Sequence, residues 1–377
     1  MNPDGGLYIH VPFCHAKCEY CDFYSITLLD QIEDFVEALL REIELRAADF
    51  REVTFATVFF GGGTPSLLSA AQLRRIWEAL QANFRIDPQG EFSIESNPGT
   101  LDLPKLQAFR ELGFNRLSMG VQSFNPQELK FLGRIHSVAE VYNSFENARM
   151  AGFSNINIDL MTAFPGITRE TFRHSLEAAL ALESEHISCY TLIFEPGTVF
   201  YKRMLRGELS PLGEDEEALY YELAAEVLAK HGYRQYEISN FARGDQYVCR
   251  HNLIYWKHRP YLGLGPSAHS FWQNTRFGNK RSLSAYVRHL KKGELAEDFR
   301  ETLSQDDLMF EYIFLSLRLR EGLDLEDFQT RFGQPLYTRH QAAIERLLAD
   351  NLIELTDHHL RLSRSSWMVA DAVAEYF

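Results

Sequence analysis

The segment FCHAKCEYCDFYS, residues 13–25, holds three of the chain's five cysteines, Cys14, Cys18 and Cys21. Directly before it stands LYIHVP, residues 7–12, a run of β-branched and aromatic residues that predicts a strand. An odd number of cysteines, with Cys189 and Cys249 solitary and distant, does not make a disulfide framework. In a reducing compartment, clustered cysteines are metal ligands or redox groups rather than disulfide partners. The loop after the first strand is therefore a predicted metal site.

Three thiolates spaced by three and two residues can converge on one polynuclear centre, and iron–sulfur clusters are held by Cys thiolates. The alternatives are uncommitted thiols or structural zinc, which takes four closed ligands, usually in two separated pairs. Only Cys189 and Cys249 could supply a fourth ligand here. Three cysteines on a cluster of four irons leave one iron open, and an open coordination position distinguishes a catalytic from a structural metal site.

Six short strand-like runs alternate with helical patterns up to about residue 200. Strand, helix, strand at this spacing predicts parallel strands joined by right-handed crossovers. Periodicity does not separate an incomplete barrel from a doubly wound sheet, but both place functional residues at the carboxyl ends of the strands. The runs begin at Leu7, Thr57, Phe92, Asn115, Asn155 and Ile187. Glycine or polar features accompany five of them, at Cys14–Cys21, Gly61–Pro65, Glu95–Pro98, Gln122 and Asp159.

The remainder of the chain changes character twice. After residue 210 come an acidic helical pattern, EDEEALYYELAAEVLAKHG, a strand-like YRQYEISNF and a stretch dense in aromatic, His and Gly residues, CRHNLIYWKHRPYLGLGPSAHS. From about Ser304, three helical patterns precede LIELTDHHLRLS, which alternates like a hairpin. We therefore expect an α/β core over 1–210, a β and aromatic extension over 211–300, and a winged-helix-like α+β domain for packing or partner binding over 301–377.

Composition excludes several classes of function. The formal net charge is −14, and no Lys/Arg cluster resembles the basic face of a nucleic-acid binder. No apolar run approaches the roughly 18–20 residues that cross a bilayer. The start, MNPDGGLYIH, has neither a basic nor an apolar region, which predicts no signal or transit peptide. We expect a soluble, cytoplasmic protein that does not bind nucleic acid.

The order of motifs resembles the radical S-adenosylmethionine (SAM) superfamily. CxxxCxxC after a first strand is followed by FFGGGTPS, IESNPGT, NRLSMGVQSF, LGRIH and NIDLM, which look like the motifs of the branch containing oxygen-independent coproporphyrinogen III oxidases. The resemblance implies a partial (βα)6 TIM-type barrel with a [4Fe-4S] cluster on Cys14, Cys18 and Cys21. It also implies a SAM pocket lined by Tyr8, Gly62, Gly63, Thr64, Glu95, Gln122, Arg134 and Asp159.

The residue types suit those roles, although each also has an ordinary structural reading. A carboxylate such as Glu95 or Asp159 accepts hydrogen bonds from ribose hydroxyls or an amino group. Arg134 presents a fork that matches the carboxylate of the methionine moiety. In isolation, Arg134 could equally form a surface ion pair and Asp159 could cap a strand end.

Two features separate the chain from the oxidases of this branch. Those continue the motif as CxxxCxxCxC, whereas Phe23 stands here in place of the fourth cysteine and cannot ligate a metal. HNLIYW, residues 251–256, resembles the HNxxYW signature of the HemW haem chaperones, and YEISNFA precedes it as in that group. A neutral imidazole is a common axial ligand of haem iron. His251 is therefore the predicted haem ligand, with His136 and His269 as rivals.

This resemblance implies a chaperone that binds the cluster, SAM and haem and transfers haem to acceptor proteins. It would act as a monomer or homodimer and contact membranes only peripherally, through its acceptors. Oxygen-independent coproporphyrinogen III oxidation in porphyrin biosynthesis needs the same cluster and stays the alternative, so enzymatic activity is left open and no catalytic residue is assigned. A tRNA-modifying radical enzyme is disfavoured by the acidic charge. For the haem site, the alternative is that His251 and Asn252 hydrogen-bond within a buried turn, with the nearby aromatic residues as ordinary core (Tyr255, Trp256, Tyr261, Phe271 and Trp272).

Overall fold

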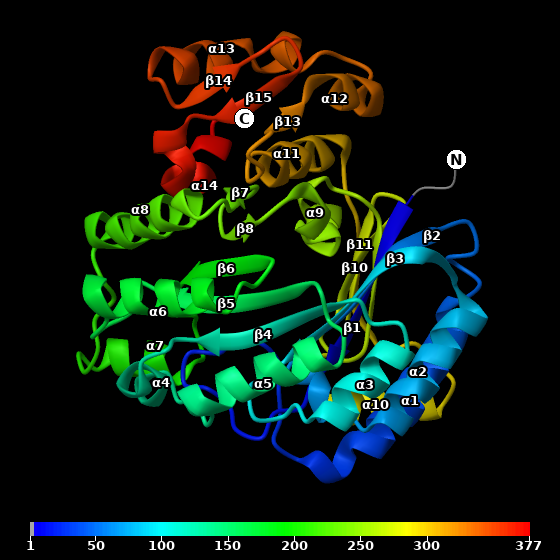
Figure 1. Ribbon diagram of the computed structural model, residues 1–377. Helices are drawn as coiled ribbons and strands as arrows, with labels where there is room; N and C mark the ends of the chain where they lie inside the picture. The colour runs from blue at the N-terminus through cyan, green and yellow to red at the C-terminus, as the bar shows by residue number, and fades with distance from the viewer. Residues whose placement is uncertain (1–3) are drawn as a thin grey trace.

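One mixed sheet of twelve strands forms the core of the molecule, whose residues 4–377 are described by a computed structural model (Figure 1). Its first six strands follow one another in chain order, each parallel to the next. A doubly wound sheet reverses its strand order, so the sequential order confirms the predicted partial barrel. These strands are β1 (Asp4–Val11), β2 (Thr54–Gly62), β3 (Arg85–Ser96), β4 (Arg116–Gln122), β5 (Ile156–Thr162) and β6 (His186–Thr191).

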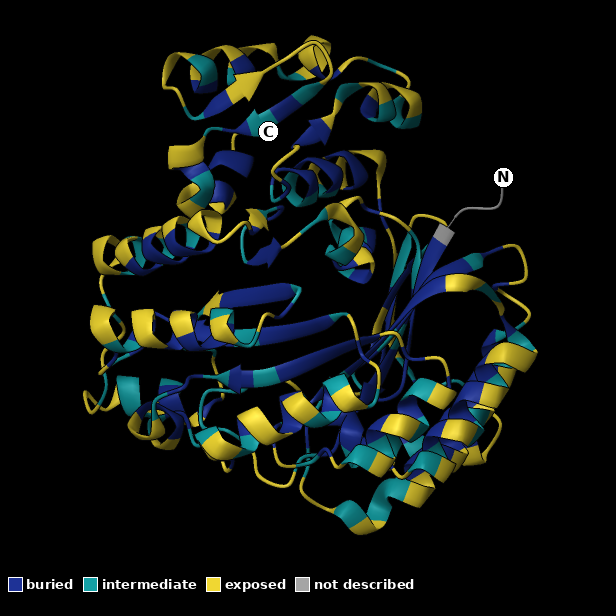
Figure 2. Ribbon diagram, viewed as in Figure 1, coloured by how far each residue is buried: buried dark blue, intermediate teal, exposed yellow. Residues whose placement is uncertain are grey.

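Helices lie outside the curved sheet, and Figure 2 shows buried strands beside helices whose outward faces are exposed. Ser69, Ser137 and Thr168 begin three of them with capping boxes, in which the side chain accepts the N–H of the third helical residue. Among residues 4–377, no helix is long and apolar enough to span a bilayer. The barrel helices are α1 (Ile32–Arg46), α2 (Ala70–Asn83), α3 (Leu103–Glu111), α4 (Pro126–Phe131), α5 (Val138–Met150), α6 (Arg169–Ala181) and α7 (Val199–Leu205).

The predicted extension adds strands to both edges of the barrel sheet. On one edge, β9 (Tyr261–Leu264) pairs in parallel with β1, and β10 (His269–Trp272), β11 (Thr275–Asn279) and β12 (Glu297–Thr302) continue antiparallel. On the other, YRQYEISNF forms two short strands, β7 (Arg234–Gln235) and β8 (Asn240–Ala242), rather than one. The HNLIYW motif lies on a helix of seven residues. The helices of this part are α8 (Glu214–Lys230), α9 (Arg250–Trp256) and α10 (Leu283–Lys291).

The C-terminal unit has a separate hydrophobic core and a three-stranded sheet of order β13-β15-β14. The three predicted helices and the hairpin are present, which confirms the small α+β unit, and a further strand and helix complete it. Its helices are α11 (Gln305–Ser316), α12 (Leu325–Phe332), α13 (Leu336–Ala349) and α14 (Ala370–Ala374). Its strands are β13 (Leu323–Asp324), β14 (Ile353–Leu355) and β15 (His359–Leu362).

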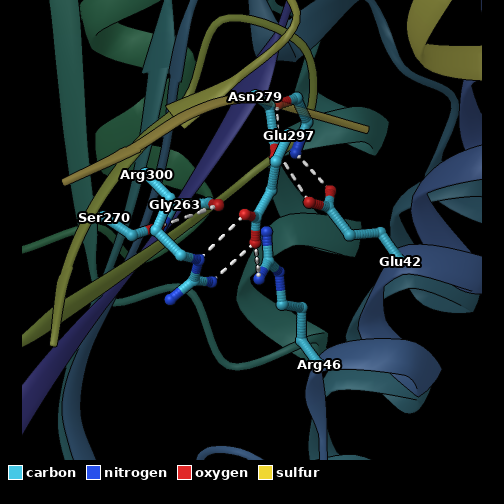
Figure 3. A network of polar contacts seen from close by, with 8 residues as sticks. Glu42, Arg46, Gly263, Ser270, Asn279, Glu297 and Arg300 are labelled. Atoms are coloured by element: carbon cyan, nitrogen blue, oxygen red, sulfur yellow. Dashed lines mark hydrogen bonds and ion pairs between the residues drawn. The ribbon is translucent and has the colours of Figure 1, made fainter. Parts of the chain in front are cut away.

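A buried polar network fastens the extension to α1, beside the strand that carries the cysteine loop (Figure 3). The Glu42 carboxylate is inaccessible to solvent and accepts hydrogen bonds from Gly265 N–H (2.8 Å), Asn279 Nδ2 (2.6 Å) and Tyr286 O–H (2.6 Å). One turn further along α1, Arg46 pairs with Glu297 on β12 at 2.5 Å. The network fixes the edge of the barrel next to β1.

Replacing Glu42 by alanine should lower the free energy of unfolding by about 3 kcal/mol, because three buried donors would lose their acceptor. Glu44, an exposed residue of the same helix paired with Arg41, provides the control: Glu44→Ala should cost at most about 1 kcal/mol. Urea unfolding of both variants measures the difference. Equal losses would show that the Glu42 network does not hold the extension in place.

Candidate functional site

A cavity of about 540 Å³ opens where the carboxyl ends of the barrel strands meet the cysteine loop. This volume lies within the range of small-molecule and cofactor sites. Tyr8 and His251 lie outside the cavity. The other predicted site residues all line it, namely Cys14, Cys18, Cys21, Gly62, Gly63, Thr64, Glu95, Gln122, Arg134 and Asp159.

The cysteine loop is held at both ends and presents its thiols to hydrogen-bond donors. Cys14 N–H donates to the Ile26 carbonyl at 2.9 Å, which closes the loop onto itself. Thr64 Oγ1 donates to Cys14 Sγ, and Arg134 Nη1 donates to Cys18 Sγ, each at 3.5 Å. Donors aimed at sulfur stabilise its ionised or metal-bound form. All three thiols are free and partly exposed.

Three thiols line the cavity, and thiolates are the ligands that hold iron–sulfur clusters. Among residues 4–377, no group of three or more His, Cys, Asp and Glu side chains is gathered closely enough to hold one ion. Cys189 is buried on β6, and Cys249 is buried before α9, where its thiol faces Glu91. Neither of them lines the cavity. The fourth ligand that structural zinc requires is therefore not supplied by a cysteine, and three thiols face one shared space.

Glycines at the end of β2 let that strand lie directly against the cysteine loop. Gly62 has φ +103°, a conformation that disfavours side chains. A Cβ on Gly63 would stand 2.6 Å from the Phe13 carbonyl oxygen. Gly63 N–H donates to the Val11 carbonyl at 2.9 Å, and Thr64 N–H donates to that of Phe13 at 2.7 Å. A larger residue at Gly63 would collide with the backbone of Phe13 at the start of the loop, and one at Gly62 would collide with the His10 ring on β1.

Two partly buried carboxyl groups, those of Glu95 and Asp159, line the cavity. Asp159 accepts hydrogen bonds from Asn157 Nδ2 at 2.7 Å and from Ser118 Oγ at 3.2 Å, while Glu95 accepts one from Gly62 N–H at 3.1 Å. Burial, and then the neighbouring Asp159 charge, raise the pKa of Glu95 to about 8. Burial also raises the pKa of Asp159. Without a ligand, Glu95 therefore holds its proton at neutral pH, and a cationic ligand would favour its ionisation.

Stability should fall as pH rises from about 4.5, the ordinary pKa of a glutamate, to about 8. In that window the unfolded chain has released the Glu95 proton that the folded protein retains, so ionisation favours unfolding. Glu95→Gln keeps an acceptor for Gly62 N–H but cannot ionise. The free energy of unfolding of this variant, relative to that of the wild type, should therefore rise by on the order of 3 kcal/mol between pH 5 and pH 8. Urea unfolding at both pH values tests this, and parallel curves would contradict it.

Arg134 links three segments that line the cavity. Its Nη2 donates to the Gly120 carbonyl at 2.7 Å and to Asn97 Oδ1, and Asn97 Nδ2 donates to Thr64 Oγ1 at 2.8 Å. Within residues 4–377, Arg134 Nε and Gln122 Oε1 are buried without a hydrogen-bond partner. Gln122 also has φ +68°, an uncommon value for a residue other than glycine. Unpaired buried groups and local strain of this kind are typical of a binding site.

Sequence reasoning included Asn97 only as part of the segment Glu95–Pro98, and it missed Ser118 and Gly120. All of them fall inside two of the motifs, IESNPGT and NRLSMGVQSF. Ser118 and Gly120 share the strand face of Gln122, because side chains on a strand alternate with period two. That alternation could have identified both.

His251 lies inside the barrel, behind the cavity wall, with 2% of its surface exposed. Its Nδ1 is 2.7 Å from Thr57 Oγ1, its Nε2 is 2.9 Å from Tyr255 O–H, and its ring stacks on Phe59 with centroids 5.0 Å apart. Burial lowers the pKa of His251 to about 3, so the ring is neutral. This is the environment of a core histidine, and ligation of haem iron by His251 would first require one of these hydrogen bonds to break.

Tyr8 supports the cavity without lining it. A Cβ on Gly61 would stand 3.0 Å from the Tyr8 ring and 3.1 Å from Glu95 Oε2, so Tyr8 lies directly behind that carboxylate. The two rival histidines differ in position. His136 lines the cavity, with Nε2 at 3.1 Å from the Val121 carbonyl, whereas His269 is exposed on β10.

Comparisons with known proteins agree with this geometry. The model of the radical SAM superfamily matches residues 8–179, and that of the HemN C-terminal domain matches residues 303–369. The haem chaperone HemW of Bacillus subtilis is 36% identical over 97% of this chain and 97% of its own length. HemW of Escherichia coli is 34% identical over 86% of this chain and 85% of its own length. The solved structure of coproporphyrinogen III oxidase HemN from Escherichia coli, a radical SAM enzyme, has the same fold: the TM-score is 0.87 at 24% identity, over 100% of this chain and 90% of that one.

Proposed function

Because the chain belongs to the HemW family of the radical SAM superfamily, we propose that it is a haem chaperone whose barrel carries a [4Fe-4S] cluster and SAM. It would hand haem to acceptor proteins. Similarity to HemW over almost the entire chain is the observation that carries this proposal. The cysteine loop at the mouth of a ligand-sized cavity supports it.

Cys14, Cys18 and Cys21 would hold the cluster, which when bound supplies an open iron for the amino and carboxylate groups of SAM. The residues of the chain would then orient the nucleotide. Gly62 and Gly63 line the cavity beside it, and the carboxyls of Glu95 and Asp159 accept its hydroxyl or amino donors. Arg134 has one unpaired donor, Nε, for a carboxylate, while its Nη1 donates to Cys18 in the cysteine loop and its Nη2 to the Gly120 carbonyl.

Phe23 argues for the chaperone and against the oxidase alternative. It stands where the oxidases of this branch carry a fourth motif cysteine, and it projects into solvent at the cavity mouth with 66% of its surface exposed. A phenyl ring neither ligates metal nor transfers a proton. The chain therefore retains the machinery for a cluster and a nucleotide but lacks one reactive group of the decarboxylating relatives.

Two assays on anaerobically reconstituted protein test the proposed function. Haemin titration should give a stable Soret band that saturates at about one equivalent. In the second assay, reductant, SAM and coproporphyrinogen III are added together, and no protoporphyrinogen should form. Absence of haem binding would refute the chaperone, and sustained turnover of coproporphyrinogen III would establish the oxidase in its place.

A further inference from the structure

Large apolar side chains surround the mouth of the cavity and remain exposed to solvent. Phe23, Ile135 and Ile193 line the cavity with 66%, 66% and 65% of their surfaces exposed. They come from three separate connections, which follow β1, α4 and β6. Single exposed apolar residues are ordinary on a protein surface, but three around one opening are typical of a binding surface. We call these three residues the apolar rim.

Two cations flank the aromatic member of the rim. Lys17 Nζ donates to the Phe23 carbonyl at 3.2 Å, and Arg281 Nη2 donates to the Asp22 carbonyl at 3.1 Å. Arg281 keeps 61% of its side chain exposed, and its only nearby carboxylate partner is Asp22, at 3.7 Å within the described residues. In a chain of net charge −14, the mouth thus offers positive charge directly beside an apolar face. Besides Asp22, the outer wall of the cavity has one more acidic residue, Glu195, which follows Ile193 by two positions in the sequence.

The cavity interior is unsuited to a macrocycle. Its lining includes the Glu95 and Asp159 carboxyls and the Arg134 guanidinium, which suit a small polar nucleotide. A second cavity of about 740 Å³ lies beside α12 and contains His258. That imidazole is buried, and its Nε2 already lies 3.3 Å from Glu311. The second cavity is also lined by large apolar side chains, including Phe271, Trp272 and Phe332. Its two arginines, Arg259 and Arg331, both pair with Asp327, at 3.8 Å and 2.9 Å.

Building on the proposed function, we infer that haem docks across the apolar rim, with its macrocycle on Phe23, Ile135 and Ile193 and its propionates toward Lys17 and Arg281. A planar apolar ring stacks favourably on an aromatic side chain. Carboxylates at its edge pair with the two cations. Phe23 then has a positive role, because it supplies a flat contact for haem at the position where the oxidases carry a thiol.

Haemin titration of the reconstituted full chain tests this inference with single substitutions. Phe23→Asp and Ile193→Asp should each raise the haem Kd at least about tenfold, since a carboxylate would be buried beneath an apolar, acidic ligand. Phe23→Leu should bind within about threefold of wild type. Met150→Asp is the matched control, because Met150 is 63% exposed on α5 and does not line the cavity. It should bind as wild type does.

The thermal midpoint should be unchanged in all of these variants, because the substituted side chains project into solvent. Wild-type haem affinity in both rim aspartate variants would overturn the inference. If His258→Ala, in which the rim is unaltered, lost haem binding, the inference would also be overturned, and the haem site would be assigned to the second cavity. Failure of the wild-type protein itself to bind haemin would instead refute the proposed function on which the inference rests.

Discussion

Replacing Cys14, Cys18 and Cys21 together by alanine should abolish the binding of iron and sulfide and leave the barrel folded. The three thiols are partly exposed and contribute little to the hydrophobic core, so their loss costs little packing. They are the predicted cluster ligands and the only thiols among the described residues that line the cavity. Iron and sulfide analysis after anaerobic reconstitution, beside circular dichroism, measures both effects.

Cys189→Ala and Cys249→Ala provide matched controls for the triple variant. Both cysteines are buried and lie outside the cavity. Their removal should leave iron and sulfide content unchanged, although each leaves a small cavity in the core that costs about 1 kcal/mol. Undiminished iron in the triple variant would show that the loop does not hold the cluster.

His251→Ala should destabilise the barrel without changing the axial ligand of bound haem. The imidazole links Thr57 to Tyr255 and stacks on Phe59, and removing it leaves a buried cavity and two unpaired hydroxyls. We expect the free energy of unfolding to fall by about 2–4 kcal/mol. The Soret maximum of the haem complex should stay where it is in the wild type. Urea unfolding and haemin titration measure the two effects separately.

The conservative variant His251→Gln sharpens this comparison. A glutamine retains polar atoms that can reach Thr57 or Tyr255, so it should recover part of the lost stability. If His251 instead ligates haem, both variants would shift the Soret band, and stability would not account for the change. Such a shift at unchanged stability would contradict a packing role for His251.

Much of the barrel could be predicted because its signals are local. Five of the six parallel strands carry three or more β-branched or aromatic residues, and β1 to β6 pair in chain order. The cysteine loop is equally local, since its three thiols lie within eight residues. Polar residues at the ends of parallel strands converge by topology alone, which is why Glu95, Gln122 and Asp159 could be placed in one cavity.

The rest depended on contacts that sequence does not reveal. The α9 helix has seven residues and no apolar period, and Glu91, distant in sequence, caps it by accepting the N–H groups of Arg250 and His251. Tyr8 and His251 lie behind the cavity rather than in it, because which face of a strand or short helix meets the pocket depends on tertiary packing. The apolar rim escaped prediction for the same reason, since Phe23 and Ile193 are 170 residues apart.

Electron paramagnetic resonance of the reduced, reconstituted protein tests most directly whether the cysteine loop leaves one iron open to SAM. Adding SAM should change the spectrum of the reduced cluster, whereas adenosine, which lacks the amino and carboxylate groups, should leave it unaltered. A cluster spectrum identical with and without saturating SAM would contradict an open iron at this loop.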